Sequence, residues 1–418
     1  MQHNIAQIAV IGGGASGLAA AIEAKRQGGR DCRVVIIEKN ARLGKKLLAT
    51  GNGRCNLGNI EEKQRMHYSG SCVDLAENLF RQHDGSEAFF KSLGVICKSD
   101  SGRLYPYSNH AASVLDALRF QVQELDIDVL TETEVTDIKV IENNIWLIKT
   151  SSREVLAEKI IIACGGKAAP VMGTDGNFFK IIKSLGHSIV HISPALCPIY
   201  TDSSLLHGLK GIRVSAKAML YDSKNKLKAS DFGEVQLTDK ALSGICIFNL
   251  ASNAIQENMY ISLDLLPHLT EHQVQELLWE IYALRSQWRI EDMLSGIFQK
   301  KLCSALFRTC NIKLSMEQQV YMLTPIDVEK LSSVIKSWRF PVMGLGDWST
   351  AQVTAGGIPA NEIENDLSSK IYPSIYFSGE ILDITGECGG YNLAWAWCSG
   401  ICAARAAVNS LKGCAGCD

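Results

Sequence analysis

A glycine-rich turn near the start of the chain carries the residues best suited to bind a phosphate group. Gly12, Gly14 and Gly17 have the spacing GxGxxG and follow an apolar run at residues 8–11. Gly12 permits a tight exit from a strand, Gly14 lets a pyrophosphate approach the backbone, and Gly17 lets a helix pack closely on a sheet. The N–H groups at the start of that helix attract phosphates. The turn therefore predicts a dinucleotide site.

An acidic residue stands where such a site requires one. Glu38 lies about 20 residues beyond Gly17, at the end of a second apolar run, residues 34–37. A carboxylate there can accept hydrogen bonds from both ribose hydroxyls of an adenosine and would repel a 2′-phosphate. Strand, turn, helix and strand form the βαβ unit that holds the ADP half of a dinucleotide. The alternative is a doubly wound domain with a glycine turn and no ligand, and the motif does not distinguish FAD from NAD.

The connection after Glu38 favours FAD. Residues 40–58 contain four glycines, which mark backbone bends or a close approach of a ligand. Lys45, Lys46 and Arg54 add cationic hydrogen-bond donors. A plain NAD dehydrogenase has no need of such a loop, whereas a protein that wraps a long cofactor does.

Two motifs from opposite ends of the chain are more specific. They are GKKLLATGNGRCN at residues 44–56 and GECGGYNLAWAW at residues 386–397. Together they resemble a family of bacterial FAD-binding proteins that includes aminoacetone-oxidase-like enzymes and flavin-dependent dehydro-bile-acid reductases. The resemblance covers nearly the whole chain and implies an FAD-dependent oxidoreductase. Its other segments are residues 102–108, 163–166, 233–234, 242–244, 351–357 and 376–383.

The last part of the chain supplies the flavin side of the expected site. Glu380 or Asp383 would hold a ribityl hydroxyl, with helix capping as the alternative role. Gly389 and Gly390 would make room for the isoalloxazine, and a helix at 393–408 would point its positive end at the flavin pyrimidine edge. By resemblance, the backbone near Val135 contacts the adenine. The residues expected to bind FAD are Gly12, Gly14, Ala15, Ser16, Gly17, Glu38, Lys39, Gly44, Lys45, Gly51, Arg54, Cys55, Asn56, Val135, Cys164, Gly165, Gly379, Glu380, Asp383, Gly389, Gly390, Tyr391, Asn392 and Leu393.

The pattern along the chain predicts an α/β protein with an insertion. A Rossmann-like FAD-binding domain of the two-dinucleotide-binding type is expected at residues 1–187 and 344–418. Short alternating runs at 188–265, continued at about 339–343, predict an inserted antiparallel β domain resembling a barrel. Helical spacing at 266–338 predicts a nested helical subdomain. Such an insertion commonly forms one wall of a substrate cleft.

Local signals predict individual elements. Helices are expected at 74–93, 109–125 and 177–185, and strands within 128–162, in the alternating stretches 129–138, 144–149 and 159–164. Thr270 is expected to cap a helix, and Pro325 to lie in a first helical turn. Ser315 and Gln318 fit a capping box, in which each side chain bonds the backbone N–H of the other residue. Trp395 and Trp397 are expected to pack in the core.

The bulk composition limits the possible partners. The chain has 418 residues, of which 46% are hydrophobic and 21% charged, and a net charge of −2. This charge gives no electrostatic case for nucleic acid or an anionic membrane. The sequence has no signal-peptide pattern and no apolar run of roughly 20 residues. A cytoplasmic enzyme with a small-molecule substrate is expected, and its oligomeric state is left open.

The cysteines are expected to be reduced. There are 14, scattered through helix-like and strand-like stretches. Cys398 and Cys402 lie four residues apart in an expected helix, where packing is the simpler role. Cys414 and Cys417 form a CxxC pair without a second ligand pair, so a redox or metal role is the less favoured reading. No metal-binding or hydrolytic motif is present.

The catalytic acid or base remains unassigned by the sequence. Tyr105, Tyr107, His110, Asp239 and Cys388 are all conceivable. The resembled family often has His where this chain has Asp239. No second GxGxxG occurs, so NADH or NADPH would dock transiently as a co-substrate.

Three functions remain possible. The favoured one is an FAD-dependent oxidoreductase that moves a hydride between flavin N5 and a small organic molecule, such as an enone reductase using NAD(P)H. The others are an aminoacetone-type amine oxidase that produces hydrogen peroxide, and a non-catalytic flavin-binding protein or RNA-modification partner.

Overall fold

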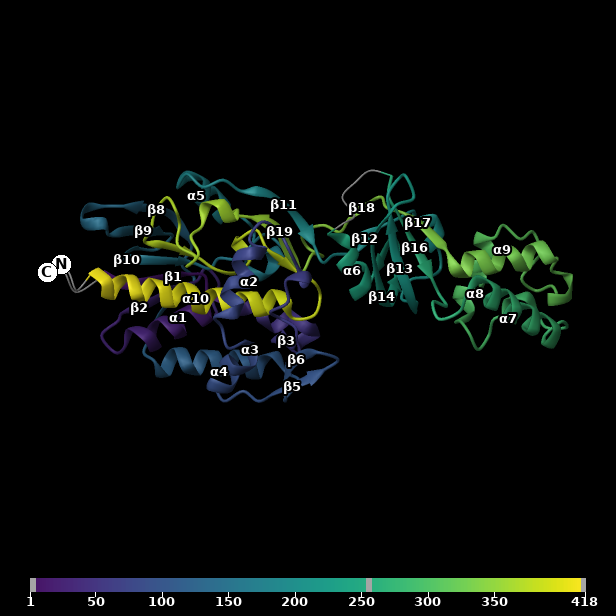
Figure 1. Cartoon of the computed structure of the whole chain (residues 1–418), viewed down its shortest axis with the longest axis horizontal. Helices are drawn as coiled ribbons and strands as arrows, with labels where there is room; N and C mark the ends of the chain where they lie inside the picture. Colours follow the sequence, from purple (N-terminus) through teal and green to yellow (C-terminus); the bar gives the residue numbers. More distant parts are fainter. Residues whose placement is uncertain (1–4, 253–257, 415–418) are drawn as a thin grey trace. The chain divides into compact units, whose positions relative to one another are not determined.

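The chain forms two compact units in the computed structural model, which describes residues 5–252 and 258–414 (Figure 1). The first unit joins both ends of the chain, Met1–Pro194 and Gln352–Asp418, and the second is Ala195–Ala351. The chain leaves the first unit after residue 194 and returns to it at residue 352. These positions lie seven and eight residues beyond the predicted boundaries at 187 and 344. The structure groups the expected β and helical parts of the insertion in one unit, and their division into two subdomains stays a prediction.

A mixed sheet forms the centre of the first unit. Its strands are β1 (Ile5–Ile11), β2 (Val34–Ile37), β7 (Asp128–Leu130), β8 (Val135–Val140), β9 (Trp146–Thr150), β10 (Glu154–Ile162) and β20 (Ile375–Phe377). Their order is β7-β2-β1-β10-β9-β8, with β20 also paired to β10. β7, β2, β1, β10 and β20 run parallel, while β9 is antiparallel to both β10 and β8. The unit therefore has the expected Rossmann-type α/β architecture.

Strand β10 connects the two ends of the chain. Its first half pairs with β9, and residues 160–162 pair with β20 from the last part of the sequence. The central part of the parallel sheet is apolar and buried: β2, β20, residues 8–11 of β1 and residues 160–162 of β10 are all buried, as strands covered on both faces require. The carboxyl ends of β1 and β10 consequently lie beside the end of β20, where ligands bind in open α/β sheets.

Two helices pack side by side along the sheet in Figure 1. They are α1 (Ala15–Gly28) and α10 (Tyr391–Cys414). Their close approach depends on small residues, because a Cβ atom at Gly400 would lie 2.3 Å from the carbonyl oxygen of Ser16. The alanine-rich face of α1 is completely buried. The packing brings the start of α1 next to residues from the end of the chain.

Two sequence predictions in this unit are wrong in detail. The expected helix at 74–93 is two helices, α2 (Val73–Arg81) and α3 (Ser86–Ser92). The break occurs because buried His83 accepts a hydrogen bond through Nδ1 from the N–H of Gly85, 2.9 Å away. The expected strand around 129–138 is divided between β7 and β8, since Thr133 N–H bonds instead to the carbonyl of Glu38. The other elements of the unit are α4 (Ala111–Glu124), α5 (Phe178–Ser184), β3 (Gly58–Asn59), β4 (Tyr68–Ser69), β5 (Cys97–Asp100), β6 (Arg103–Pro106), β11 (Val190–Ala195), β19 (Val353–Gly357) and β21 (Thr385–Gly386).

The second unit contains an antiparallel sheet. Its order is β17-β16-β13-β14-β15-β12-β18, and its predicted closure into a barrel stays a prediction. The strands are β12 (Ile199–Tyr200), β13 (Arg213–Tyr221), β14 (Leu227–Leu237), β15 (Ala241–Ser243), β16 (Tyr260–Asp264), β17 (Trp338–Pro341) and β18 (Gly344–Leu345). The helices are α6 (Ile245–Ala251), α7 (Glu271–Leu284), α8 (Lys300–Thr309) and α9 (Pro325–Lys336).

Two of the three predicted helix starts in this unit are confirmed. Thr270 forms a capping box with Gln273 at the start of α7, and Pro325 begins α9. At the third position Gln318 does accept from the N–H of Ser315, but the chain turns into a short 3₁₀ segment instead of an α-helix. Within the described ranges, no helix is long and apolar enough to cross a membrane.

Candidate cofactor site

The glycine turn leaves an open space at the start of α1. Gly12 has φ +104, and a Cβ atom at Gly17 would lie 1.8 Å from the carbonyl oxygen of Gly12. The helix therefore begins directly against the end of β1. A Cβ atom at Gly14, in contrast, would meet no atom within 4 Å. The helix N-terminus also offers N–H groups without partners inside the helix, so this space suits a phosphate.

The carboxylate of Glu38 is held in place by the protein. Its Oε2 accepts from the N–H of Gly13 at 2.7 Å, and its Oε1 accepts from the backbone N and Nδ2 of Asn40 at 2.8 and 2.6 Å. The residue is only 7% exposed. An ionised carboxylate has about four acceptor positions, so these three bonds leave capacity for roughly one further donor. Glu38 can thus receive one ribose hydroxyl while it ties the turn to the following loop.

A lysine of the glycine-rich loop reaches the last part of the chain. In η2 (Lys45–Gly53), Lys46 Nζ lies 3.1 Å from Glu380 Oε2 and 3.3 Å from the carbonyl oxygen of Ala168. Lys45 bonds instead to the exposed carbonyl of Val171. Lys46 was outside the expected set. The sequence could not choose between the adjacent lysines because their partners, Val171 and Glu380, lie more than 120 residues away along the chain.

The two acids near the end of β20 have different surroundings. Glu380, in η10 (Gly379–Ile381), accepts through Oε1 from the N–H of Thr354 at 2.7 Å, and its carboxylate lies within 4 Å of the Cβ position of Gly165. Asp383 is buried and accepts through Oδ2 from the N–H of Ser71 at 2.9 Å. Glu380 is therefore the acid beside the strand ends, while Asp383 anchors a neighbouring loop. A ribityl contact stays a prediction for both.

Asn56 provides an acceptor that the protein leaves unpaired. Its Oδ1 is buried and has no hydrogen-bond partner within residues 5–252 and 258–414. A Cβ atom at Gly390 would lie 2.7 Å from this oxygen and 2.3 Å from the carbonyl oxygen of Gly58. The glycine is thus required by packing against β3, and its expected role of making room for the flavin ring stays a prediction. The orphaned oxygen fits a donor on a bound ligand, such as an imide N–H.

Several other expected cofactor residues are held by protein contacts. Cys55 is fully buried, which raises the pKa of its thiol to about 11, and burial also raises the pKa of Cys164. Arg54 stacks over the Tyr105 ring at 4.2 Å and donates to its hydroxyl. Lys39 forms an ion pair with Asp175. A direct role in binding FAD stays a prediction for each.

The other residues expected to bind FAD lie in several elements of the first unit. Ser16 is buried, and a Cβ atom at Gly379 would lie 2.6 Å from its Oγ. Gly44 N–H donates to the carbonyl of Gly13, so the loop begins against the turn. Val135 begins β8, where it pairs with Thr150. The remaining expected residues, Ala15, Gly51 and Leu393, lie at the starts of α1 and α10 and within η2.

The start of α10 is fixed by hydrogen bonds within the chain. Asn392 donates through Nδ2 to the carbonyl of Gly386 and accepts through Oδ1 from its N–H, at 2.7 and 2.9 Å. This side chain therefore closes the 386–392 turn. Trp395 donates to the carbonyl of Gly379 and Trp397 to that of Leu57. Both rings are buried, in agreement with their expected packing role.

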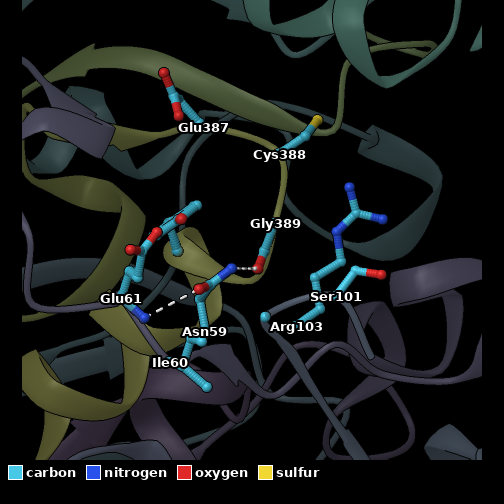
Figure 2. A pocket seen from close by; sticks show the side chains of 10 residues that line it. Asn59, Ile60, Glu61, Ser101, Arg103, Glu387, Cys388 and Gly389 are labelled. Carbon is cyan, nitrogen blue, oxygen red and sulfur yellow. Dashed lines mark hydrogen bonds between the residues drawn. The ribbon is translucent and has the colours of Figure 1, made fainter. Parts of the chain in front are cut away.

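A polar hollow lies beside this turn. Figure 2 shows Asn59 donating through Nδ2 to the carbonyl of Gly389, 3.0 Å away, at its base. The hollow has a volume of about 420 Å³. It is lined by Asn59, Ile60, Glu61, Ser101, Gly102, Arg103, Glu387, Cys388, Gly389 and Tyr391.

Tyr391, which lines the hollow, packs against the ring of His67. Their rings stack with centroids 4.3 Å apart, and His67 Nδ1 lies 2.8 Å from Glu387 Oε2. Burial, with Glu61 and Glu387 nearby, raises the pKa of Tyr391 to about 12. The phenol is neutral at ordinary pH and can donate a hydrogen bond or a proton.

The five side chains considered as the catalytic acid or base do not lie together. Cys388 lines the hollow, whereas Tyr107 is 71% exposed and the backbone of His110 caps α4. Tyr105 is buried beneath Arg54, and Asp239, in the other unit, pairs with Lys210. Sequence reasoning did not single out Tyr391 as an acid, because its environment comes from residues 61, 67 and 387.

The cysteines give no metal site in the described part of the chain. Between residues 5 and 414, apart from the undescribed 253–257, no cluster of three or more His, Cys, Asp or Glu side chains could hold a metal ion. Cys398 and Cys402 are free thiols in α10. Cys417, half of the CxxC pair, lies outside the described residues.

FAD fits the residues present. The open space at Gly14 suits a pyrophosphate, the remaining acceptor capacity of Glu38 suits a ribose, and the orphaned Asn56 oxygen suits a flavin donor. The turn, the loop and α10 come together from both ends of the chain. Fold and site define an α/β flavoprotein of the dinucleotide-binding class.

Comparison with known proteins agrees with this class. Residues 6–406 match the family described as "HI0933-like protein Rossmann domain". The chain therefore belongs to this family of Rossmann FAD-binding proteins, and it is an FAD-dependent oxidoreductase.

Its relatives carry two kinds of name. A 3-dehydro-bile acid delta(4,6)-reductase of Clostridium scindens is 35% identical over 410 residues, 96% of this chain and 99% of the relative. A ribosomal RNA dihydrouridine synthase of Escherichia coli is 28% identical over 405 residues, 93% of this chain and 95% of the relative. Among solved structures, a Rhodococcus jostii 3-ketosteroid-delta4-(5alpha)-dehydrogenase has a TM-score of 0.49 and 14% identity, with 98% of each chain covered.

Proposed function

We propose that this protein is an FAD-dependent reductase of a carbon–carbon double bond conjugated with a carbonyl group, with NADH or NADPH as the electron donor. The observation that carries the proposal is the match to the bile-acid reductase over almost the full length of both chains. When bound, the flavin supplies a hydride at N5. A proton for the adjacent carbon then has to come from the protein or from water.

The two kinds of relative share this chemistry. In a 3-dehydro bile acid with double bonds at positions 4 and 6, both are conjugated with the 3-keto group. The C5=C6 bond of uridine, which is saturated in dihydrouridine, is conjugated with the C4 carbonyl. In each case a hydride would add to the end of the conjugated system remote from the carbonyl, and a proton would then add to a carbon that carries negative charge in the resulting enolate. The proposed reaction is therefore the one common to both names.

The residues of this chain would hold the cofactor from both sides. The turn at Gly14 would bind the pyrophosphate, Glu38 a ribose hydroxyl, and Asn56 a donor on the flavin. Glu380, oriented by Lys46, would face the ribityl chain. The start of α10 would point its positive dipole end toward negative charge on a reduced flavin bound at this site.

Tyr391 is the proposed proton donor. It lines the hollow beside the 386–392 turn, and its raised pKa keeps the phenol protonated. His67 and Glu387 fix the position of its ring. A neutral phenol can donate its proton to a carbonyl oxygen or to a carbon of the enolate.

The experiment is an anaerobic half-reaction assay. The purified protein is mixed with NADH, NADPH or a panel of amines, and bleaching of the visible flavin bands is followed. The bleached protein is then mixed with conjugated enones, including steroid 4-en-3-ones, and with uridine. We expect bleaching by a nicotinamide nucleotide and recovery of the flavin colour with an enone.

Other outcomes would contradict the proposal. Bleaching by amines but not by nicotinamides would indicate the amine oxidase. A protein that is colourless and does not bind added FAD would exclude every flavin-dependent reaction. A saturated ketone that restores the colour as fast as the matching enone would show that the double bond is not the acceptor.

A further inference from the structure

A short hairpin carries an arginine to the hollow beside the 386–392 turn. Strands β5 and β6 are joined by Ser101 and Gly102, whose φ angles of 51 and 83 both belong to the left-handed region. Two such residues in succession form the two-residue turn that matches the twist of an antiparallel pair. Arg103 begins β6, where it pairs with Asp100 of β5 and with Asn59 of β3. The backbone of Arg103 is therefore held from both sides.

The same small sheet is tied to the turn that carries Tyr391. Asn59 donates through Nδ2 to the carbonyl of Gly389 at 3.0 Å, and Arg103 and Tyr391 both line the hollow. Burial and two nearby acids raise the pKa of Tyr391, and the positive charge of Arg103 opposes them. The hairpin and the turn thus place a guanidinium and a neutral phenol at one cavity.

The guanidinium of Arg103 is available to a ligand. The side chain is half-buried, and within residues 5–252 and 258–414 it forms no ion pair and no hydrogen bond. Arg54, in contrast, stacks over the Tyr105 ring and lies 3.8 Å from Asp100. A guanidinium presents a planar fork of N–H donors, and its hydrogen bonds to a negatively charged oxygen are among the strongest in proteins. Arg103 can therefore receive an oxygen of a molecule in the hollow.

The two acids of the hollow have a different partner. His67 lies between them, with Nδ1 2.8 Å from Glu387 Oε2 and Nε2 3.6 Å from Glu61 Oε2. Figure 2 draws both acids at the left of the hollow and the Arg103 side chain at the right. Two acids and one arginine give the hollow an excess of negative charge, which disfavours a substrate with a permanent negative charge there. A neutral carbonyl group meets no such repulsion.

We propose that Arg103 is a catalytic residue that binds the carbonyl oxygen of the substrate and stabilises the negative charge which this oxygen acquires during the reaction. The inference rests on the reductase function proposed above. A hydride from the reduced cofactor adds to the far end of the conjugated system, and the electrons of the double bond move toward the carbonyl to give an enolate. The Tyr391 hydroxyl then gives its proton to an enolate carbon, the C=O bond forms again, and the phenolate takes a proton from water.

The charges around the hollow suit this division of roles. The acids beside Tyr391 keep its phenol protonated until an enolate is present. Arg103 supplies positive charge at the place where the enolate oxygen forms. A donor fixed in advance at a developing oxyanion acts without reorganisation, and loss of one such donor lowers a rate by about 100-fold or more.

An enolate mimic tests the site without turnover. 4-Nitrophenolate is a flat anion with charge on its oxygen, and 4-nitroanisole is the neutral methyl ether of the same ring. Both are dialysed to equilibrium against the oxidised, FAD-loaded protein in mildly alkaline buffer, in which the phenol is ionised. Arg103→Gln should weaken nitrophenolate binding about tenfold or more and should change nitroanisole binding much less.

Two further variants serve as controls for this measurement. Arg153→Gln, at an exposed arginine between β9 and β10, should change the binding of neither probe. Arg103→Lys keeps the charge but loses the planar fork, so it should bind nitrophenolate more tightly than Arg103→Gln and less tightly than the original protein. It also keeps the test valid if Arg103→Gln does not fold.

The two half-reactions provide the second readout. Arg103→Gln should slow reoxidation of the reduced protein by a neutral steroid 4-en-3-one about 100-fold or more, and reduction by NAD(P)H should keep its rate. Nitrophenolate binding that is absent or independent of Arg103, or an unchanged reoxidation rate, would overturn the proposal. An effect confined to acceptors that carry a carboxylate would also overturn it, because Arg103 would then bind that group.

Failure of this inference can be distinguished from failure of the proposed function. Arg103-dependent binding of nitrophenolate by a protein that no enone reoxidises would contradict only the reductase function. Rapid enone reduction by Arg103→Gln would contradict only the role of Arg103.

Discussion

Lys46 Nζ lies 3.1 Å from Glu380 Oε2 and so joins the loop after β2 to the segment after β20. Both side chains are only partly exposed, at 26% and 20%, so solvent screens the pair less than it would a surface ion pair. Their contact fixes the carboxylate beside the ends of the central strands. It therefore links the two ends of the chain at the place where the cofactor is expected.

Lys46→Met should weaken FAD binding by about tenfold. The substitution leaves a partly buried carboxylate without its cation, at a cost of about 1–3 kcal/mol. FAD titration of the cofactor-free protein, followed by flavin fluorescence quenching, measures this. Lys91→Met is the matched control, because Lys91 is an exposed lysine of α3 outside the expected cofactor residues. Equal losses in the two variants would contradict a specific role for the Lys46–Glu380 pair.

Two glycine substitutions should separate folding from binding. Gly17→Ala puts a Cβ atom 1.8 Å from a backbone oxygen, so the free energy of unfolding should fall by about 3 kcal/mol or more. Gly14→Ala puts it into open space and should leave the cofactor-free protein within about 1 kcal/mol of its original stability. It should nevertheless weaken FAD binding, since the methyl group occupies the phosphate space. Urea unfolding and FAD titration of both variants provide the comparison.

Asn56→Leu should leave the stability of the cofactor-free protein almost unchanged, but it should weaken FAD binding. Replacing an unpaired buried acceptor by an apolar side chain of similar size changes stability by less than about 1 kcal/mol. Loss of a hydrogen bond to the flavin would weaken FAD binding by about 5- to 10-fold. Thermal unfolding with and without FAD measures both effects. A large loss of stability in the cofactor-free variant would show that Asn56 has a structural role instead.

Tyr391→Phe should slow only the reaction with the double-bond substrate. Loss of a general acid lowers a rate by about 100-fold or more, while reduction of the flavin by NAD(P)H should be unaffected. Stopped-flow mixing of each half-reaction separates them, and Tyr107→Phe, an exposed phenol, serves as the control. Because the pKa of Tyr391 is raised to about 12, the acceptor half-reaction should keep its rate up to about pH 11. An equal slowing of both half-reactions would point to disturbed cofactor binding.

His83 should make the fold less stable in mild acid. Burial, with Arg405 and Lys63 nearby, lowers the pKa of His83 to about 4, whereas an unfolded histidine has about 6.5. Between these values the unfolded chain binds a proton that the folded chain does not, so stability is lost as pH falls from about 6.5 to 4. The loss is at most roughly 3 kcal/mol.

His83→Asn provides the comparison for this effect. The asparagine Oδ1 can still accept from the N–H of Gly85, but it does not titrate. Urea unfolding at several pH values should show a smaller acid dependence in the variant than in the original protein. Parallel curves over this range would mean that other groups cause the acid sensitivity.

The sequence by itself determined the βαβ unit and the class of cofactor. A glycine turn between apolar runs, with an acid at the second strand end, depends on contacts among neighbouring residues, so local pattern is sufficient to predict it. The helices that begin at clear capping residues, such as those at Thr270 and Pro325, were predicted correctly for the same reason. The single helix expected at 74–93 did not, because a buried histidine from a polar-looking stretch ends it.

Only the tertiary structure decided which side chains meet. Lys46 instead of Lys45 reaches Glu380, Asp383 turns away to anchor Ser71, and Gly390 is required by the carbonyl of Gly58. These choices depend on the pairing of β10 with β20 and on the packing of α10 against α1, which join residues far apart in the sequence.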